Sequence, residues 1–251
     1  MKTHLHFQHL SSTNAYLKDL VEKYPVNQLQ NFFPPYFSVT ADEQNAGRGQ
    51  QGKKWESETG KNVLASFLLY PTIHPARQFT VCQYISVAIA EFIQETFSIS
   101  NVHIKWSNDI YMGDKKVVGI LIEHFLCGEK INYTIAGVGM NINQKIFPSH
   151  LPNPTSLSLE TGQEYDLIFC LESIIEKIKQ TEKLSDAELK NRYLRFLYRK
   201  DVFSDFFVPK ISPTPLSLKI TGVNELGLLE LVDENNMLYF CAFNEISYLN
   251  L

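Results

Sequence analysis

A glycine-rich, basic segment, GRGQQGKKWESETGKN (residues 47–62), is the first feature of the sequence that could carry chemistry. Its glycines let the backbone bend and expose N–H groups, and Arg48, Lys53 and Lys54 add positive charge. Such a loop can wrap a nucleotide phosphate, although a solvated connector has the same composition. It nearly matches the Walker A pattern, but Lys54 stands where Ser or Thr would bind Mg²⁺ and no amphipathic helix follows. We therefore reject a P-loop.

A second segment, KWSNDIYMGDKKVVGILIEH, places a cation, an amide and a carboxylate at the end of an expected strand. Another lysine begins the returning strand, and a glycine beyond it leaves room for a ligand to approach the backbone. In that order, these residues are Lys105, Asn108, Asp109, Lys116 and Gly119. The group suits a site that binds charge and manages a proton. An exposed hairpin with a surface ion pair is the alternative, and composition does not choose between them.

The third segment is GVGMNIN, residues 137–143. Gly137 and Gly139 lie on one face of an expected strand and thin it, and Asn141 points the same way by the period of two. The strand could offer a flat surface for a ring, with Asn141 contacting phosphate or ribose. A tightly packed pair of strands would explain the same residues.

A sheet is expected to position these segments. Apolar runs predict strands near residues 4–6, 36–40, 63–70, 102–106, 109–112, 116–124 and 131–143. His4 and His6 could share a metal, but no third ligand is evident, so we interpret them as part of an exposed edge strand. A wide apolar face predicts a core helix over 80–97. Capping signals predict helices after Ser12 or Thr13, over 166–181 after Asp166, and over 185–199, where Ser185 and Glu188 can form a capping box.

The pattern changes after residue 200. A proline-rich stretch, PKISPTP, precedes short apolar runs (LSLKI, LLELV, MLYFCAF and ISYL) separated by turn residues. We therefore predict two domains, residues 1–200 and 201–251. The first should be a mixed sheet with helices on one side, and the second a small β-barrel.

Composition limits the class of protein. The chain has 251 residues, 44% hydrophobic and 20% charged, which is typical of a globular protein. Its net charge is −4 without a basic stripe, which argues against a nucleic-acid partner. The N-terminus lacks a signal peptide and no apolar run is long enough to span a membrane. Four dispersed cysteines in apolar segments, Cys82, Cys127, Cys170 and Cys241, indicate buried, reduced thiols in a cytoplasmic protein.

Taken together, the three segments resemble the biotin–protein ligase family. That family's pattern is GRGxxGxxWxSxxGxN, then KWxNDxxxxxxKxxGIL, then GxGxN, and the order is the same here. Residues 12–14 (STN) and Gln44 also match. The resemblance is close over residues 7–145 and loose beyond. It implies an α+β fold, with a mixed β-sheet and flanking helices followed by an SH3-like β-barrel. Because the motifs start at residue 12, we expect the single-function type without an N-terminal DNA-binding domain.

The resemblance implies an ATP-dependent ligase. Such an enzyme activates biotin with ATP and Mg²⁺ to biotinyl-5'-AMP, then forms an amide bond with a lysine of a biotin carboxyl carrier protein. The chemistry is sound because a carboxylate is a poor acylating agent until it is activated as a mixed anhydride. We expect no nucleic-acid or membrane partner. The sequence does not determine the oligomeric state, and a homodimer is one possibility.

Residue by residue, the resemblance implies two groups of contacts. The ureido end of biotin would be held by Ser12, Thr13, Asn14 and Gln44. The mobile loop that closes over biotin and the acyl phosphate would include Gly47, Arg48, Gly49 and Gln50. Trp55 would meet the adenine, Lys105 and Asn108 the phosphates, Lys116 the biotin carboxylate with Gly119 beside it, and Asn141 the nucleotide. Lys116, Arg48 and Asp109 would be catalytic, with Asp109 binding Mg²⁺ or accepting the proton of the incoming lysine.

The chain departs from the family's pattern at two positions. Gln50 replaces a frequent arginine, which removes a cation from the loop and weakens its expected grip on the acyl phosphate. Ser107 replaces the proline of KWPND without removing a reacting group. We expect loop 44–61 to be mobile without ligand and to order with biotin. The alternatives are a lipoate ligase or octanoyl transferase, a non-catalytic phosphate-binding module, and a DNA-binding regulator.

Overall fold

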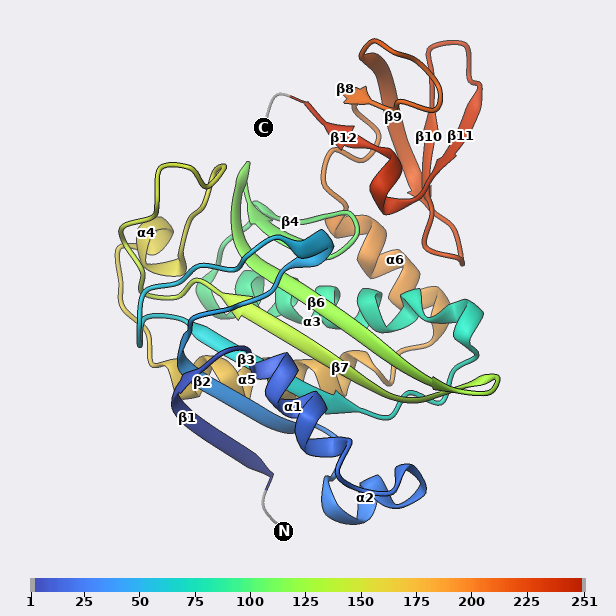
Figure 1. Ribbon diagram of the computed structural model, residues 1–251. Helices are drawn as coiled ribbons and strands as arrows, with labels where there is room; N and C mark the ends of the chain where they lie inside the picture. Colours follow the sequence, from blue (N-terminus) through green and yellow to red (C-terminus); the bar gives the residue numbers. More distant parts are fainter. Residues whose placement is uncertain (1–2, 250–251) are drawn as a thin grey trace.

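The computed structural model describes residues 3–249 and is built on a seven-stranded sheet (Figure 1). The strand order is β1-β2-β3-β7-β6-β5-β4. The strands are β1 (His4–Leu10), β2 (Phe37–Gln44), β3 (Val63–Leu69), β4 (Val102–Lys105), β5 (Asp109–Met112), β6 (Lys115–Cys127) and β7 (Lys130–Met140). β1 runs parallel to β2 and the other neighbours are antiparallel. The predicted mixed sheet is confirmed, and β1 is an edge strand as expected.

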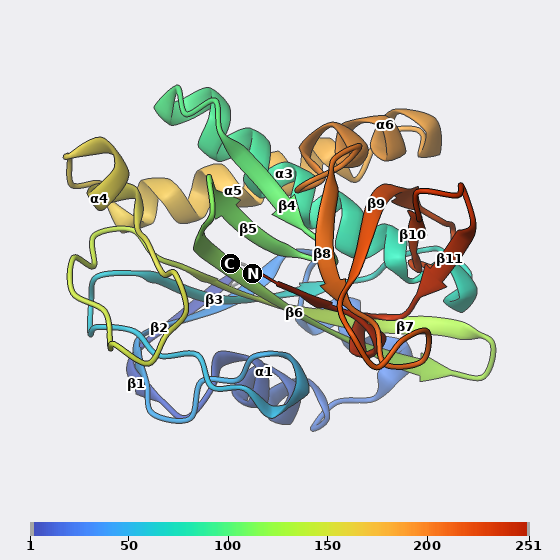
Figure 2. The same cartoon turned by 90° about the horizontal axis from the view of Figure 1, so that it is seen from above.

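Helices cover both faces of this sheet (Figure 2). One face carries α3 (Phe79–Phe97), α5 (Leu167–Thr181) and α6 (Asp186–Phe196), and the other carries α1 (Thr13–Val21) and the short α2 (Leu29–Phe32). The expectation of helices on one side was therefore wrong. Every residue of β3 is buried. Phe67 packs in the cluster formed with α3, while Leu68 packs in the cluster formed with α1.

Local capping signals determine where the longer helices begin. The Ser12 side chain accepts a hydrogen bond from the Ala15 N–H at the start of α1, and Asp166 caps α5. Ser185 and Glu188 form the predicted capping box of α6. The sequence patterns did not predict the short α4 (Leu157–Thr161), which is too brief to show a helical period.

A second, antiparallel sheet follows, with the order β11-β10-β9-β8-β12. Its strands are β8 (Phe203–Phe207), β9 (Leu216–Val223), β10 (Leu229–Val232), β11 (Leu238–Cys241) and β12 (Ser247–Tyr248). β8 was not predicted, because only Phe206 among its residues is fully buried. The small sheet packs against the first at Trp106, whose indole N–H donates to the Gly227 carbonyl (3.1 Å). The domain boundary at residue 200 stays a prediction.

Three of the four cysteines, Cys82, Cys170 and Cys241, are buried and have free thiols. Cys127 is exposed, so the prediction that it is buried was wrong. It ends β6 at the tip of the β6–β7 hairpin, where the strand has left the core. Among the described residues, no helix combines the length and the apolar character that crossing a membrane requires.

Candidate active site

One cavity of about 270 Å³ gathers most of the residues that the sequence singled out. It lies where β6 and β7 meet the start of α1 and the glycine-rich loop. The predicted residues on its wall are Ser12, Thr13, Asn14, Gln44, Arg48, Gly49, Gln50, Trp55, Lys105, Asp109, Lys116, Gly119 and Asn141. Gly47 and Asn108 do not line it. Segments far apart in the chain therefore build one site.

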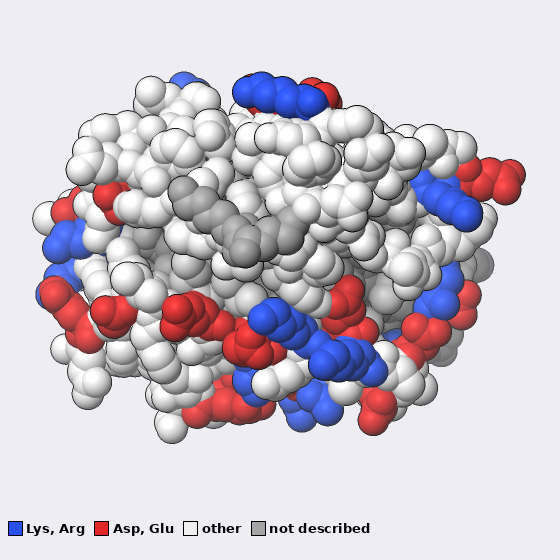
Figure 3. Space-filling view, turned by 90° about the horizontal axis from the view of Figure 1, so that it is seen from below, with Lys and Arg blue, Asp and Glu red and all other residues white. Residues whose placement is uncertain are grey.

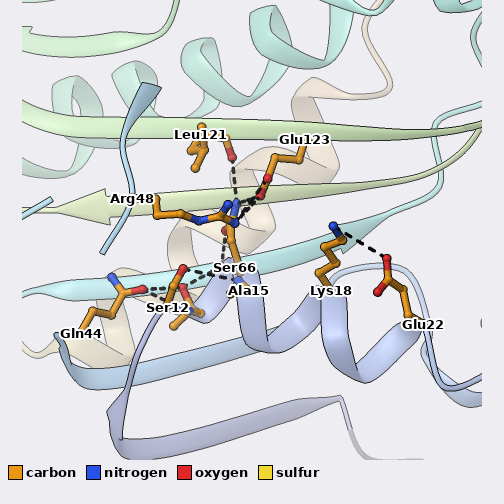
Figure 4. A network of polar contacts seen from close by, with 11 residues as sticks. Ser12, Ala15, Lys18, Glu22, Gln44, Arg48, Ser66, Leu121 and Glu123 are labelled. Atoms are coloured by element: carbon orange, nitrogen blue, oxygen red, sulfur yellow. Dashed lines mark hydrogen bonds and ion pairs between the residues drawn. The ribbon is translucent and has the colours of Figure 1, made fainter. Parts of the chain in front are cut away.

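The start of α1 forms a neutral, hydrogen-bonding end of the cavity (Figure 4). Gln44 at the end of β2 accepts from the Thr13 backbone N–H (2.7 Å) and hydroxyl (3.2 Å). The Ser66 hydroxyl of β3 donates to Thr13 Oγ1 (2.7 Å). Hydroxyls and amides at a helix start suit a ligand that both donates and accepts hydrogen bonds.

Asn14 belongs to this end and depends on a glycine. A Cβ at Gly137 would lie 2.3 Å from Asn14 Oδ1, so any side chain there would displace the amide. Asn14 Nδ2 donates to Glu123 Oε2 (2.8 Å). The Arg48 guanidinium also reaches Glu123 (3.1 Å), so one carboxylate joins α1 to the loop (Figure 4).

The glycine-rich loop folds as a small hairpin over the cavity, with η2 (Gln50–Gly52) at its tip. Arg48 and Lys54 form a β-bridge, and the Gly49 N–H donates to the Lys53 carbonyl (2.6 Å). At the base, the Trp55 N–H donates to the Gly47 carbonyl (3.0 Å), and a Cβ at Gly47 would meet the Trp55 carbonyl at 2.6 Å. Gly47 therefore allows the hairpin to close. The expected ordering of loop 44–61 by biotin stays a prediction.

Trp55 lies on a floor made of two glycines. Gly119 of β6 and Gly139 of β7 are paired across the strands. A Cβ would lie 2.6 Å from the indole ring at Gly119 and 2.5 Å from it at Gly139. The indole Nε1 is buried without a hydrogen-bond partner among the described residues. The ring on this flat strand surface is therefore the protein's own Trp55, and its N–H has no acceptor among the described residues.

The opposite end of the cavity is charged. Lys116 Nζ lies 2.6 Å from Asp109 Oδ2 and 5.8 Å from the centre of the Trp55 ring. Lys105 Nζ lies between the rings of Tyr111 (5.2 Å) and Tyr248 (4.9 Å). Burial lowers the pKa of Lys105 to about 8, with help from neighbouring cations and against the attraction of Asp109. Two lysines beside one carboxylate can bind and orient an anion.

Asn141 is fixed but only partly satisfied. Its side-chain N–H donates to the Thr155 carbonyl (2.9 Å). This bond identifies the nitrogen of the amide and therefore the oxygen as well. Its Oδ1 is buried without a partner among the described residues. Because the remaining atom is an acceptor, Asn141 suits a hydroxyl donor such as a ribose better than a phosphate.

Some residues in or beside the cavity carried no assignment from the sequence. Glu123 contacts Asn14 and Arg48 from behind the cavity wall. It is a carboxylate within an apolar strand, and that contrast could have marked it. Phe243 comes from the small C-terminal sheet, and Phe147 and Pro154 come from the segment after β7. These positions have no local signal, because only the tertiary fold brings them to the cavity.

The cavity has a neutral, hydrogen-bonding end and an end lined by lysines, and it lies on a mixed sheet that is followed by a small β-domain. Such a cavity can accept a ligand with a neutral polar end and an anionic end. The chain belongs to the biotin/lipoate A/B protein ligase family, whose model matches residues 7–141. It is 36% identical over 140 residues to the bifunctional ligase/repressor BirA of Bacillus subtilis, covering 55% of this chain and 43% of that protein. It is 28% identical over 138 residues to the biotin–[acetyl-CoA-carboxylase] ligase of Paracoccus denitrificans, covering 51% of this chain and 55% of that protein.

Solved structures agree on the fold. The biotin protein ligase from Aquifex aeolicus in complex with biotin and ATP has a TM-score of 0.76 at 24% identity and covers 98% of both chains. The Leishmania major biotin protein ligase with biotin has a TM-score of 0.63 at 18% identity, covering 96% of this chain and 99% of that one. The chain thus spans less than half of its Bacillus relative but nearly all of these structures.

Proposed function

We propose that this protein is a biotin–protein ligase that forms biotinyl-5'-AMP from biotin and ATP and transfers biotin to a lysine of a biotin carboxyl carrier protein. One observation carries the proposal. A single cavity joins a neutral hydrogen-bonding end at α1 to a lysine pair. Two buried polar atoms of residues on its wall, Trp55 Nε1 and Asn141 Oδ1, have no hydrogen-bond partner within residues 3–249. Biotin has a ureido ring at one end and a carboxylate at the other, and the cavity offers partners for both.

The α1 end would hold the ureido ring. A ureido group has two N–H donors and a carbonyl acceptor, and the hydroxyl and amide groups of Ser12, Thr13, Asn14 and Gln44 can meet both kinds of atom. Apart from Gln44, these groups are almost fully buried. Their hydrogen bonds to a ligand would therefore form away from competing water.

The lysine end would support the first chemical step. A carboxylate oxygen of biotin attacks the α-phosphorus of ATP, and pyrophosphate leaves. Lys116 would lie between the two anions and offset the charge that builds on the attacked phosphate. Lys105 would bind the phosphates, while the ribose would donate to Asn141 Oδ1.

Asp109 is a suitable ligand for the Mg²⁺ that the reaction would need. Within residues 3–249, no three His, Cys, Asp or Glu side chains gather into a self-sufficient metal site. Mg²⁺ often takes only one or two carboxylates and completes its shell with substrate phosphates and water. When bound, it would neutralise phosphate charge. Asp109, on the cavity wall between the lysines, is the carboxylate that would hold it.

In the second step, the ε-amine of the acceptor lysine attacks the acyl carbon, AMP leaves, and the amine loses a proton. Asp109 is the carboxylate that would receive that proton. The hairpin 47–55 would shield the mixed anhydride from water until the acceptor arrives. The free cysteines and the need for ATP are consistent with the cytoplasm.

The proposal is tested by incubating the protein with ATP, Mg²⁺, biotin and a biotin carboxyl carrier domain. Mass spectrometry should find biotin on one lysine of the carrier, and none on a carrier with that lysine changed to arginine. A parallel reaction with lipoate in place of biotin distinguishes a biotin ligase from a lipoate ligase, the two kinds of ligase in the family's description. Transfer of lipoate but not biotin would reject the proposal.

The Lys105 environment predicts a pH dependence. Because its pKa is lowered to about 8, the neutral form grows as pH rises above that value, and the attraction for phosphate is lost. The KM for ATP should rise about tenfold from pH 7 to pH 9. Lys105→Arg keeps its charge across this range and should flatten the profile. An unchanged slope in that variant would show that another group titrates.

We expect no sequence-specific DNA binding by this chain. Its net charge is −4. On the coloured surface in Figure 3, acidic and basic side chains are interspersed and form no purely basic stripe. Nucleic-acid affinity depends on such a stripe. A mobility-shift experiment at physiological salt, with and without biotin, checks this, and a sequence-dependent shift would contradict it.

A further inference from the structure

Asn108 is a motif residue whose polar atoms are all engaged within the protein. It is buried, with 3% of its surface exposed, and it does not line the cavity. Its Nδ2 donates to the Ile120 carbonyl of β6 (2.6 Å). Its Oδ1 accepts from the Ser107 hydroxyl (2.7 Å) and from Gln50 Nε2 (2.8 Å).

These bonds determine the orientation of Asn108. The Ile120 contact requires the amide nitrogen on that side, so the oxygen faces the two donors. An amide oxygen has two lone pairs, and here each receives one donor. Asn108 Oδ1 therefore has no lone pair left for a ligand, and Asn108 does not line the cavity. Its link to the cavity runs through Gln50, which lies at the tip of the hairpin and does line the wall.

We propose that Gln50, Asn108 and Ser107 form a neutral latch: before biotin binds, these hydrogen bonds raise the fraction of molecules in which the mobile hairpin 47–55 lies over the cavity. Asn108 and Ser107 act through Gln50 and are positioning residues. The inference rests on the proposed function only for the identity of the ligand that the hairpin would cover. Gln50 and Ser107 are also the two departures from the pattern that the motifs resemble, and their side chains meet at one oxygen atom.

The latch differs from the hairpin's other attachment. Arg48 holds the hairpin to Glu123 by an ion pair whose side chains are 46% and 27% exposed. Salt screens such a partly exposed pair. The latch carries no net charge and its acceptor is buried, so it should hold the hairpin at salt concentrations that weaken the ion pair.

Trypsin offers a direct test, because Arg48, Lys53 and Lys54 are cleavage sites within the hairpin. The full-length protein, without biotin or ATP, is digested at 0.5 M salt, and the rate of cleavage at these sites is followed by mass spectrometry. Gln50→Leu removes the donor at similar size, and Gln50→Glu replaces the donor with an acceptor at the same shape. Each should speed cleavage by about two- to tenfold, the effect of losing one neutral hydrogen bond.

Ser107→Ala should speed cleavage less, because Ile120 and Gln50 still hold Asn108. In the double variant, Ser107→Ala should add nothing to Gln50→Leu, since Ser107 acts through the same contact. General destabilisation would instead give additive effects. The matched controls are Gln30→Leu, at an exposed position, and Ser212→Ala, at a partly exposed one. Both positions lie away from the hairpin, and both variants should cleave like the unmodified protein.

Equal cleavage rates in Gln50→Glu and the unmodified protein, or additive effects in the double variant, would overturn the latch. This digestion uses neither substrate, so its result is independent of the proposed reaction. If the Gln50 variants are cleaved faster but the unmodified protein transfers no biotin, the latch is supported and only the ligase activity is rejected.

Discussion

Replacing Lys116 with alanine should lower the rate of adenylate formation by about 10²–10³-fold, the effect of removing one group that stabilises developing charge. Two unit charges of like sign about 4 Å apart repel by about 4 kcal/mol at an effective dielectric near 20. A carboxylate approaching an α-phosphate faces this repulsion, and in the proposed reaction Lys116 is the cation that would offset it. Lys116→Gln should be nearly as poor, because the charge is what matters.

The structure also predicts that the Lys116→Ala variant folds. The Lys116 backbone is held on both sides, by the Asn153 carbonyl (2.7 Å) and the Thr155 N–H (2.9 Å), and the side chain is 30% exposed. Lys115 is a matched control, since it lies on the same strand and pairs with Glu160 on the outside (3.1 Å). Lys115→Ala should keep normal activity. Normal pyrophosphate exchange by Lys116→Ala, with unchanged thermal melting, would remove Lys116 from the site.

Changing Gly139 to alanine should lower activity by about 10²-fold, although it adds one methyl group. The new Cβ would lie 2.5 Å from the Trp55 ring, so the indole must leave the floor it shares with Gly119. The hairpin that carries Trp55 would shift with it. A misplacement of about 1 Å at a reacting site can cost this much.

Indole fluorescence reports this displacement directly. The protein has two tryptophans, so Trp106→Phe leaves Trp55 as the single reporter. In that background, Gly139→Ala should shift the Trp55 emission toward that of a water-exposed indole and raise the KM for ATP. An unchanged emission with an unchanged KM would show that the indole tolerates the methyl group and that the floor has no role.

Much of the fold could be predicted from local patterns. The hairpin of β5 and β6, the cap at Ser12 and the capping box at Ser185 depend on residues close in the chain, so the sequence reveals them directly. The position of α1 was not predictable in the same way. The continuous apolar run of β3 is consistent with burial on both faces, but it does not show which helix covers which face.

The site residues also divide into those that a local pattern predicts and those that only the tertiary fold brings together. The three motifs predicted most of the cavity wall, because each motif is continuous in the chain. The partners that orient those residues come from elsewhere: Glu123 joins Arg48 to Asn14, and Phe243 arrives from the second sheet. The sequence also could not show that Asn108 lies behind Gln50 and does not line the cavity, since a strand end leaves its side-chain direction open.

The most direct test of the central claim is the exchange of labelled pyrophosphate into ATP by the purified protein. Reversible attack of the biotin carboxylate on the α-phosphate should make this exchange depend strictly on biotin and Mg²⁺. Lys116→Ala should reduce it by about 10²–10³-fold, whereas Lys115→Ala should leave it unchanged. Exchange that proceeds equally without biotin, or that is absent when all three components are present, would contradict biotin activation at this cavity.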